Sequence, residues 1–309
     1  MGRQITLTAG NDSFTQSAVA NNVALQIFGL AGNDTIILDR TDDFGGSNRV
    51  DAGAGDDGVV NHREFGNVIG LGDGNDTYVG LGFGSFSSDI ADQVFAGLGN
   101  DTFAVQTFKS QYFGQAGNDI FHSVGWANTF NGGSGVDTIS YQPRSDDTTS
   151  GVTVDLAAGL AQTRATRQET LISIENVIGS NNDDAIFGSS GANRITGAQG
   201  FDQMTGRGGA DQFVFRSAAD AQVSSENVDI ILDFNRAQND KVNVHGIDAN
   251  STTAGNQDFQ LISTAFTRHA GELRFQDGLV QGDINGDGRA DFQIYLHNVN
   301  AMQASDFIL

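Results

Sequence analysis

Aspartates placed at a fixed distance from glycines are the residues of this chain with the clearest chemistry. The segment from residue 179 to residue 214 divides into four consecutive nonapeptides, GSNNDDAIF, GSSGANRIT, GAQGFDQMT and GRGGADQFV. Their sixth positions are Asp184, Asn193, Asp202 and Asp211. Glycines at the earlier positions allow the positive φ of a turn that gathers backbone carbonyls, and the aspartate adds a carboxylate beside them. Oxygen ligands of this kind suit a hard cation such as Ca²⁺.

The same aspartate returns along the N-terminal part of the chain, at less regular intervals of 22, 23, 19, 25, 18 and 18 residues. These seven aspartates are Asp12, Asp34, Asp57, Asp76, Asp101, Asp119 and Asp137. Seven positions before them stand Ile5, Ile27, Val50, Ile69, Val94, Tyr112 and Phe130. Two positions after them stand Phe14, Ile36, Val59, Tyr78, Phe103, Phe121 and Ile139. This apolar frame predicts one strand pair per coil, with the rest of each coil a variable segment.

Two explanations of these aspartates are open. A turn-forming aspartate that caps its own backbone needs no cation, but it predicts equal use of Asp and Asn and no fixed apolar frame. Asp fills ten of the eleven sixth positions, which favours cation ligation. We expect weaker sites where the interval exceeds 18 residues, because neighbouring turns need not stack in register. Asn193 predicts a weaker site on the face that it shares with Asp211, because an amide oxygen lacks the charge.

A second pattern of oxygen-bearing residues lies near the C-terminus. Asp283, Asn285, Asp287 and Asp291 occupy positions one, three, five and nine of a loop whose glycines permit a sharp turn. The pattern is similar to that of calcium loops found in hairpins, although Ile294 stands where an EF-hand places its bidentate Glu. The alternative is an ion-free Asn-Gly-Asp-Gly hairpin turn.

Short strands must position all of these turns. Each repeat strand carries a single inward apolar residue, so two nonapeptides make one coil of 18 residues with aspartate stacked on aspartate. We therefore expect an all-β fold, a parallel β-roll or β-solenoid with a β-rich C-terminal cap. The expected parts are an irregular solenoid at residues 1–140, an insertion with joining strands at 141–178, a tandem nonapeptide roll at 179–214 and the cap at 215–309.

Two family resemblances follow from these motifs. Residues 132–140 read GGSGVDTIS and match G-G-x-G-x-D-x-U-x, where U is a large apolar residue, so the chain resembles the repeats-in-toxin proteins. That resemblance implies several bound Ca²⁺ ions. From about residue 173 the chain resembles the C-terminal domain of the serralysin metalloproteases, in the stretches SIENVIGS, GADQFVF, DIILDFNRAQNDKVNV and SDFIL. This second resemblance implies further calcium ligands at Glu175, Asp233 and Asp240.

The resemblance does not extend to the protease itself. None of the five histidines begins the H-E-x-x-H motif that binds catalytic zinc, so no protease activity is expected. Residues 306–309, DFIL, resemble the acidic-then-apolar terminus that type I exporters read in serralysins. The resemblance thus implies a type I exporter as partner during secretion and an extracellular or cell-surface location.

The amino-acid composition excludes several classes of binding partner and of metal site. The chain has 38 acidic and 16 basic residues, and its formal net charge of −22 argues against nucleic acid or an anionic membrane surface as a partner. Lys109 and Lys241 are the only lysines. The absence of cysteine excludes disulfides and thiolate metal sites, and no apolar stretch approaches the length of a membrane span.

The expected function is that of a secreted, non-enzymatic, calcium-binding protein. Its calcium-stabilised rod would serve adhesion, surface coating or a biofilm matrix, with a cell-surface or matrix polysaccharide as the candidate partner. The chain carries no nucleophile elbow or other hydrolase motif. The rival is a carbohydrate-active solenoid of the polyuronate lyase or epimerase kind, with Arg40, Arg49 and Arg63 as its candidate basic residues. A third possibility is a fragment or accessory domain whose effector lies on another chain.

Overall fold

The computed structural model describes residues 3–19, 23–40, 46–62, 64–81, 91–142, 150–164, 166–223 and 228–309. The described chain is almost wholly β-structure, and the predicted fold class, an all-β parallel solenoid, is confirmed. It divides into two compact units. Unit 1 comprises Met1–Asp146 and Gly159–Ile174, and unit 2 comprises Asp147–Ala158 and Glu175–Leu309. Among the described residues, no helix is long and apolar enough to cross a membrane.

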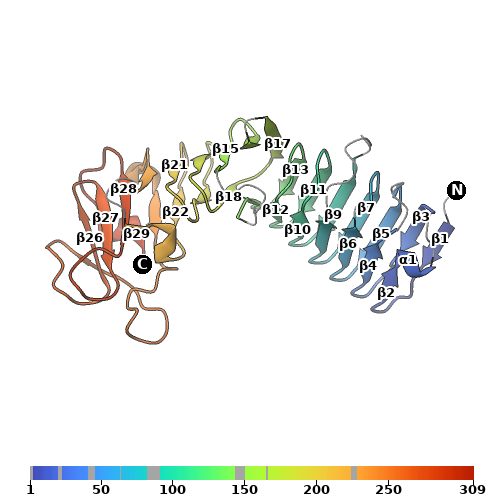
Figure 1. Ribbon diagram of the computed structural model, residues 1–309, viewed down its shortest axis with the longest axis horizontal. Coiled ribbons are helices and arrows are strands. Elements are labelled where there is room, and N and C mark those ends of the chain that lie inside the picture. Colours follow the sequence, from blue (N-terminus) through green and yellow to red (C-terminus); the bar gives the residue numbers. More distant parts are fainter. Residues whose placement is uncertain are drawn as a thin grey trace. The chain divides into compact units, whose positions relative to one another are not determined.

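Unit 1 is a stack of coils that alternate between two parallel sheets (Figure 1). Its sheet A contains β1 (Arg3–Thr6), β3 (Leu25–Phe28), β5 (Arg49–Ala54), β7 (Val68–Asp73), β9 (Gln93–Leu98), β11 (Gln111–Ala116), β13 (Thr129–Ser134) and β17 (Arg167–Ile172), with β16 (Leu160–Arg164) antiparallel to β17. Its sheet B contains β2 (Ser13–Thr15), β4 (Thr35–Leu38), β6 (Gly58–His62), β8 (Thr77–Leu81), β10 (Thr102–Val105), β12 (Ile120–Ser123) and β14 (Thr138–Ser140). A single helical turn, α1 (Gln16–Val19), follows β2.

The predicted apolar frame forms the core of unit 1. Thirteen of its fourteen residues are buried, and Ile5 in the first strand is half-buried. Equivalent residues of successive coils stand in register, as Ile69 does with Val94 and Phe103 with Phe121. The rings of Phe103 and Phe121 stack with centroids 4.7 Å apart. The two sheets therefore enclose a single column of stacked side chains, which explains why each strand needs only one or two inward apolar residues.

The two edges of unit 1 differ in the regularity of their turns. From β5 onward, the turn that leads from sheet A to sheet B always has three residues, at 55–57, 74–76, 99–101, 117–119 and 135–137. A positive-φ glycine opens each of these turns, and a methyl group built on Gly99 would collide with the carbonyl of Gly74 in the preceding coil. The connections back from sheet B to sheet A vary between five and eleven residues over the same coils. All length variation is therefore confined to one edge.

Unit 2 begins as a narrower roll. One of its sheets runs through β15 (Thr153–Asp155), β19 (Ala185–Phe187), β21 (Gln203–Thr205), β23 (Asp229–Ile231) and β28 (Phe292–Leu296). The other runs through β18 (Asn176–Ile178), β20 (Arg194–Thr196), β22 (Gln212–Val214), β24 (Lys241–Asn243) and β29 (Phe307–Ile308). The tandem nonapeptides supply β19 to β22, each with its apolar eighth residue buried.

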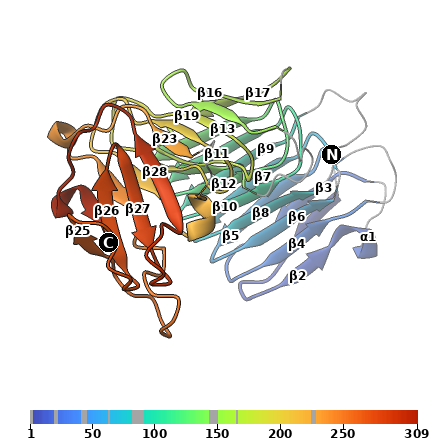
Figure 2. The ribbon, with the colours of Figure 1, turned by 60° about the vertical axis from the view of Figure 1, so that its left-hand side comes forward.

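The rest of unit 2 is a cap of longer strands. The antiparallel strands β26 (Glu272–Gln276), β27 (Leu279–Asp283) and β28 lie side by side, as Figure 2 shows, and β25 (Gln260–Ile262) pairs with β26. Short 3-10 helices lie at η1 (Ala218–Asp220), η2 (Arg236–Gln238) and η3 (Ala304–Asp306). Because β28 also pairs with β23, the cap continues one sheet of the roll.

Candidate metal centres

The repeat aspartates of unit 1 form one continuous ladder along the edge of constant turns. The backbone N–H of each aspartate donates to Oδ1 of the aspartate in the next coil, at 2.7–2.8 Å. The ladder runs through Asp12, Asp34, Asp57, Asp76, Asp101, Asp119 and Asp137. The expectation that intervals above 18 residues disturb the register is wrong, because the extra residues lie in the connections at the opposite edge.

The second carboxylate oxygen of these residues, Oδ2, takes no part in the hydrogen bonds of the ladder. Oδ2 is buried and has no hydrogen-bond partner among the described residues in Asp34, Asp57, Asp76, Asp101 and Asp119. At Asp119 it faces the Cα of Gly114, where a methyl group would collide with it and would lie 2.6 Å from the carbonyl oxygen of Gly132 in the next coil. A carboxylate oxygen and a carbonyl oxygen thus lie around one place, and a hard cation fits between oxygens of these two kinds.

Burial makes this ladder electrostatically costly in the absence of a cation. Desolvation raises the pKa of Asp76 to about 6 and that of Asp101 to about 7, against the lowering effect of one backbone N–H each. Neighbouring aspartates add to the rise in both cases. The pKa values of Asp57 and Asp119 are raised by the same burial. A nearby positive charge favours the ionised form, so a cation would oppose all of these shifts.

Unit 2 has a ladder of the same kind in front of β19, β21 and β23. The N–H of Asp184 donates to Asp202 at 2.8 Å, and that of Asp202 donates to Asp229 at 2.9 Å. Oδ2 of both Asp202 and Asp229 is buried without a partner among the described residues. Burial and then the charges of Asp184 and Asp229 raise the pKa of Asp202 to about 9. Burial also raises the pKa of Asp184 and that of Asp229 to about 7.

A second ladder in unit 2 lies in front of the other sheet. The N–H of Asn193 donates to Asp211 at 2.8 Å, and that of Asp211 donates to Asp240 at 3.0 Å. The amide of Asn193 donates to the carbonyl of Glu175 at 2.7 Å, a hydrogen bond that an ionised aspartate could not donate. Oδ2 of Asp211 has no partner among the described residues. Asp233 accepts the N–H groups of Gly206 and Arg207, and its charge raises the pKa of both Asp211 and Asp240 after burial.

The hairpin loop between β27 and β28 brings Asp283, Asn285, Asp287 and Asp291 together, as their spacing predicts. The two oxygens of Asp283 accept the N–H groups of Gly286 and Gly288, at 2.6 and 2.8 Å. Asn285 accepts from Asp287, and Asp291 accepts from Ile284, at 2.8 and 2.7 Å. These bonds suit both the calcium loop and the ion-free turn, so calcium in this loop stays a prediction. Within the described part of the chain, no three His, Cys, Asp or Glu side chains gather around one point.

The sequence interpretation missed two features of these edges. Asp229 continues the ladder 27 residues after Asp202, and its signal was the apolar residue two positions later, Ile231. The opposite edge of unit 1 carries a largely neutral ladder in which N–H groups donate to the side chains of Asn48, Asn67, Asp92, Ser110 and Asn128, at 2.8–3.3 Å. Each of these small polar residues stands two positions before an inward apolar residue, so the sequence contained this signal as well.

Comparison with known proteins agrees with the motifs of the second half. Residues 168–309, just under half of the chain, match the family described as Peptidase M10 serralysin C terminal. No curated protein matches the chain. Among solved structures, the extracellular lipase LipA from Serratia marcescens aligns with 93% of this chain, at 13% identity and a TM-score of 0.28.

The alignment covers 62% of the lipase chain, and a likeness this remote carries no argument about function. The family match lies where the predicted resemblance begins, since SIENVIGS and the tandem repeats fall inside it. Residues 168–309 are therefore similar to the serralysin C-terminal domain, as the motifs predict.

Proposed function

We propose that this chain is a secreted calcium-binding protein that folds around Ca²⁺ held at its aspartate ladders and acts, without catalysis, as a rigid rod for adhesion, surface coating or a matrix. The observation that carries the proposal is the set of buried carboxylate oxygens without a hydrogen-bond partner among the described residues. They belong to Asp34, Asp57, Asp76, Asp101, Asp119, Asp202, Asp211 and Asp229. Buried polar atoms are nearly always satisfied, so a repeated exception at equivalent positions points to a common missing partner.

Calcium suits these positions better than a proton does. One proton per carboxylate would need an acidic medium for the groups with a pKa of about 6 or 7. Ca²⁺ takes six to eight oxygens and accepts carboxylates and carbonyls together. An ion that binds the folded chain alone adds RT ln(1 + [L]/Kd) to stability, which is about 1.4 kcal/mol per site at ten times Kd. Several such sites together would exceed the marginal stability of a small domain, about 5 kcal/mol.

Export before folding is supported by the last residues of the sequence. Asp306 is 1% exposed and forms an ion pair with Arg236 at 2.6 Å, and Phe307 in β29 is buried. An exporter that recognises residues 306–309 would have to bind them before the chain folds and buries Asp306 and Phe307. Inside a cell, Ca²⁺ is far below the dissociation constants of extracellular sites, about 10⁻⁴ to 10⁻³ M, so the ladders would be empty and mutually repelling.

The rival carbohydrate-active enzyme has weaker support. The guanidinium of Arg40 donates to the carbonyl of Gly46 at 3.3 Å, so it is engaged within its own loop. Arg49 lies exposed at the start of β5, and Arg63 falls outside the described residues. A catalytic base usually has its pKa shifted by a buried setting, and neither of the two described arginines lies in one. We therefore prefer a binding function to a catalytic one.

Circular dichroism of the full chain, first in chelator and then in millimolar calcium, tests the proposal. We expect a less stable chain with less β-structure in chelator and a cooperative gain of β-structure on addition of Ca²⁺, with Mg²⁺ as the control ion because it demands a smaller octahedral site. Isothermal titration would then count the ions bound. A chain that is fully β-structured in chelator and binds no Ca²⁺ would refute the proposal.

A further inference from the structure

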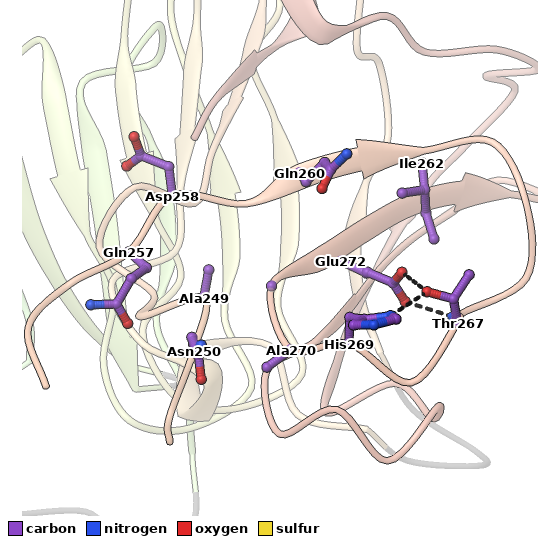
Figure 3. A pocket seen from close by; sticks show the side chains of 11 residues that line it. Ala249, Asn250, Gln257, Asp258, Gln260, Ile262, Thr267, His269, Ala270 and Glu272 are labelled. Atoms are coloured by element: carbon purple, nitrogen blue, oxygen red, sulfur yellow. Dashed lines mark hydrogen bonds between the residues drawn. The ribbon is translucent and has the colours of Figure 1, made fainter. Parts of the chain in front are cut away.

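A cavity of about 500 Å³ in unit 2 has no part in the ladders. It is lined by the segment 249–258, by β25 and by the loop that leads into β26 (Figure 3). Its volume lies within the range of small-molecule sites, about 300 to 1,000 Å³. The cavity is therefore large enough to be a binding site, and its lining decides what it would take.

One wall of the cavity holds a fixed chain of hydrogen bonds. Glu272 is 6% exposed and accepts both the N–H of Thr267, at 2.7 Å, and the hydroxyl of Thr267. The hydroxyl oxygen lies 2.8 Å from Nδ1 of His269. Since Thr267 gives its hydrogen to Glu272, it must accept one from His269, so Nδ1 carries a proton and Nε2 is left for a ligand.

The charge state of this wall follows from the same contacts. Burial alone would raise the pKa of Glu272, but the hydrogen bonds from Thr267 and the proximity of His269 outweigh burial and lower it. The carboxylate is therefore ionised, and each of its oxygens already accepts a hydrogen bond from Thr267. It positions His269 rather than offering itself to a ligand.

Several other polar groups of the lining have no hydrogen-bond partner in the described part of the protein. The side-chain amide of Gln260 makes no hydrogen bond with the described residues, and Oε1 of Gln257 is buried without one. Asn250 uses its side-chain oxygen to accept from Thr252, which leaves its Nδ2 hydrogens. Together with Nε2 of His269 these groups supply both donors and acceptors, and Figure 3 shows that they come from opposite sides of the cavity. Oε1 of Gln257 is the buried member of this set, and a ligand that both donates and accepts, as a hydroxyl does, would match the set as a whole.

The remaining lining residues exclude other ligands. Among the residues that the structure describes, no lysine or arginine lines the cavity, which argues against an anion. Both oxygens of Glu272 already accept hydrogen bonds, and Asp258 is the only other carboxylate that lines the cavity in the described part of the chain, which argues against a divalent cation. Ile262 and Ala270 add small apolar surface of the kind that contacts the C–H groups of a sugar ring.

We propose that this cavity binds a neutral sugar residue of a cell-surface or matrix polysaccharide. The inference deepens the proposed function and rests on it, because it names the chemical class that a non-catalytic rod of this kind would hold. Gln260 and Nε2 of His269 would contact sugar hydroxyls, while Glu272 and Thr267 keep the imidazole in place.

The test uses the full chain in millimolar calcium and four probes, the methyl glycosides of glucose, galactose, mannose and N-acetylglucosamine. Saturation-transfer NMR should show binding of at least one, and the variants Gln260→Leu and His269→Ala should each weaken it about three- to tenfold. Gln276→Leu and His297→Ala are the matched controls, because Gln276 and His297 are also exposed in the cap and lie outside the cavity. Both controls should bind as the unchanged chain does.

Each outcome decides between the two proposals. A chain that folds in calcium and binds none of the four glycosides overturns the sugar site but leaves the calcium proposal intact. Equal loss in the control variants, or stronger binding of methyl glucuronide or of a diamine than of every neutral glycoside, also overturns the sugar site. A chain that does not respond to calcium overturns the proposed function itself.

Discussion

The backbone N–H of Asp101 donates to Oδ1 of Asp119 at 2.8 Å, while Oδ2 of Asp119 is buried and has no partner among the described residues. The same carboxylate thus holds one coil to the next with one oxygen and leaves the other unsatisfied. The hydrogen bond needs only an oxygen, which Asn would also supply. Asn would place an uncharged NH₂ group where Asp119 has its unsatisfied oxygen, so the effect of that oxygen can be measured by substitution.

Replacing Asp119 with Asn should change stability in opposite directions with and without calcium. In chelator, Asp119→Asn removes a buried charge, and its amide could donate to the Gly132 carbonyl that lies beside Oδ2 of Asp119, so the free energy of unfolding should rise by about 1 kcal/mol. In calcium the variant loses a ligand and should lose about 1 kcal/mol relative to the unchanged chain. Urea denaturation under both conditions measures this. Asp51→Asn, at an exposed position of β5, should have no effect, and a same-signed change in both buffers would contradict the ligand role.

The raised pKa values predict an unusual pH dependence in the absence of calcium. A carboxyl whose folded-state pKa exceeds its unfolded value stabilises the protein below the unfolded pKa, and this stabilisation is lost as the pH rises through the folded value. The relevant values are about 6 for Asp76, about 7 for Asp101 and about 9 for Asp202. In chelator, the free energy of unfolding should therefore fall between pH 5 and pH 9. Millimolar calcium should abolish the fall, and a stability that rises with pH in chelator would disagree with the burial of these groups.

One phenylalanine inside the core of unit 1 and one on its outer surface should differ strongly in their contribution to stability. Phe103 is fully buried in the core column, so Phe103→Ala should lower the free energy of unfolding by about 3 to 5 kcal/mol. Phe95 points outward and stacks on Phe113 with centroids 4.8 Å apart, so Phe95→Ala should cost about 1 kcal/mol. Chemical denaturation in calcium compares them. Equal losses would show that the assigned inward register is incorrect.

The neutral edge of unit 1 should not respond to calcium. The amide of Asn48 donates to Glu64 at 2.6 Å, and its oxygen accepts the N–H of Leu25. Asn48→Asp would replace that donor by a charge facing a buried carboxylate and should cost about 3 kcal/mol in chelator and in calcium alike. Asn131→Asp, at a half-exposed outward position of β13, serves as the control and should cost little. Rescue of Asn48→Asp by calcium would show that both edges can bind the ion.

The coil frame was readable from the sequence because it repeats. Each aspartate of the ladder stands between two inward apolar residues at constant offsets, as Asp119 does between Tyr112 and Phe121, and these offsets survive any change in loop length. Asp229 was missed because the glycines that announce the earlier repeats stop before it. The cavity of the cap had no motif at all, since its walls come from residues as far apart as Asn250 and Glu272, whose approach depends on the packing of irregular loops.

The two edges of unit 1 should respond differently to the calcium concentration, because one is built from aspartates and the other largely from amides. If calcium leaves, repulsion between carboxylates would push the coils apart along the aspartate edge, while the hydrogen bonds through Asn48 and Asn67 would hold the other edge closed. A stack that expands along one side only must bend. The calcium concentration would then control the curvature of unit 1 before it controls its unfolding.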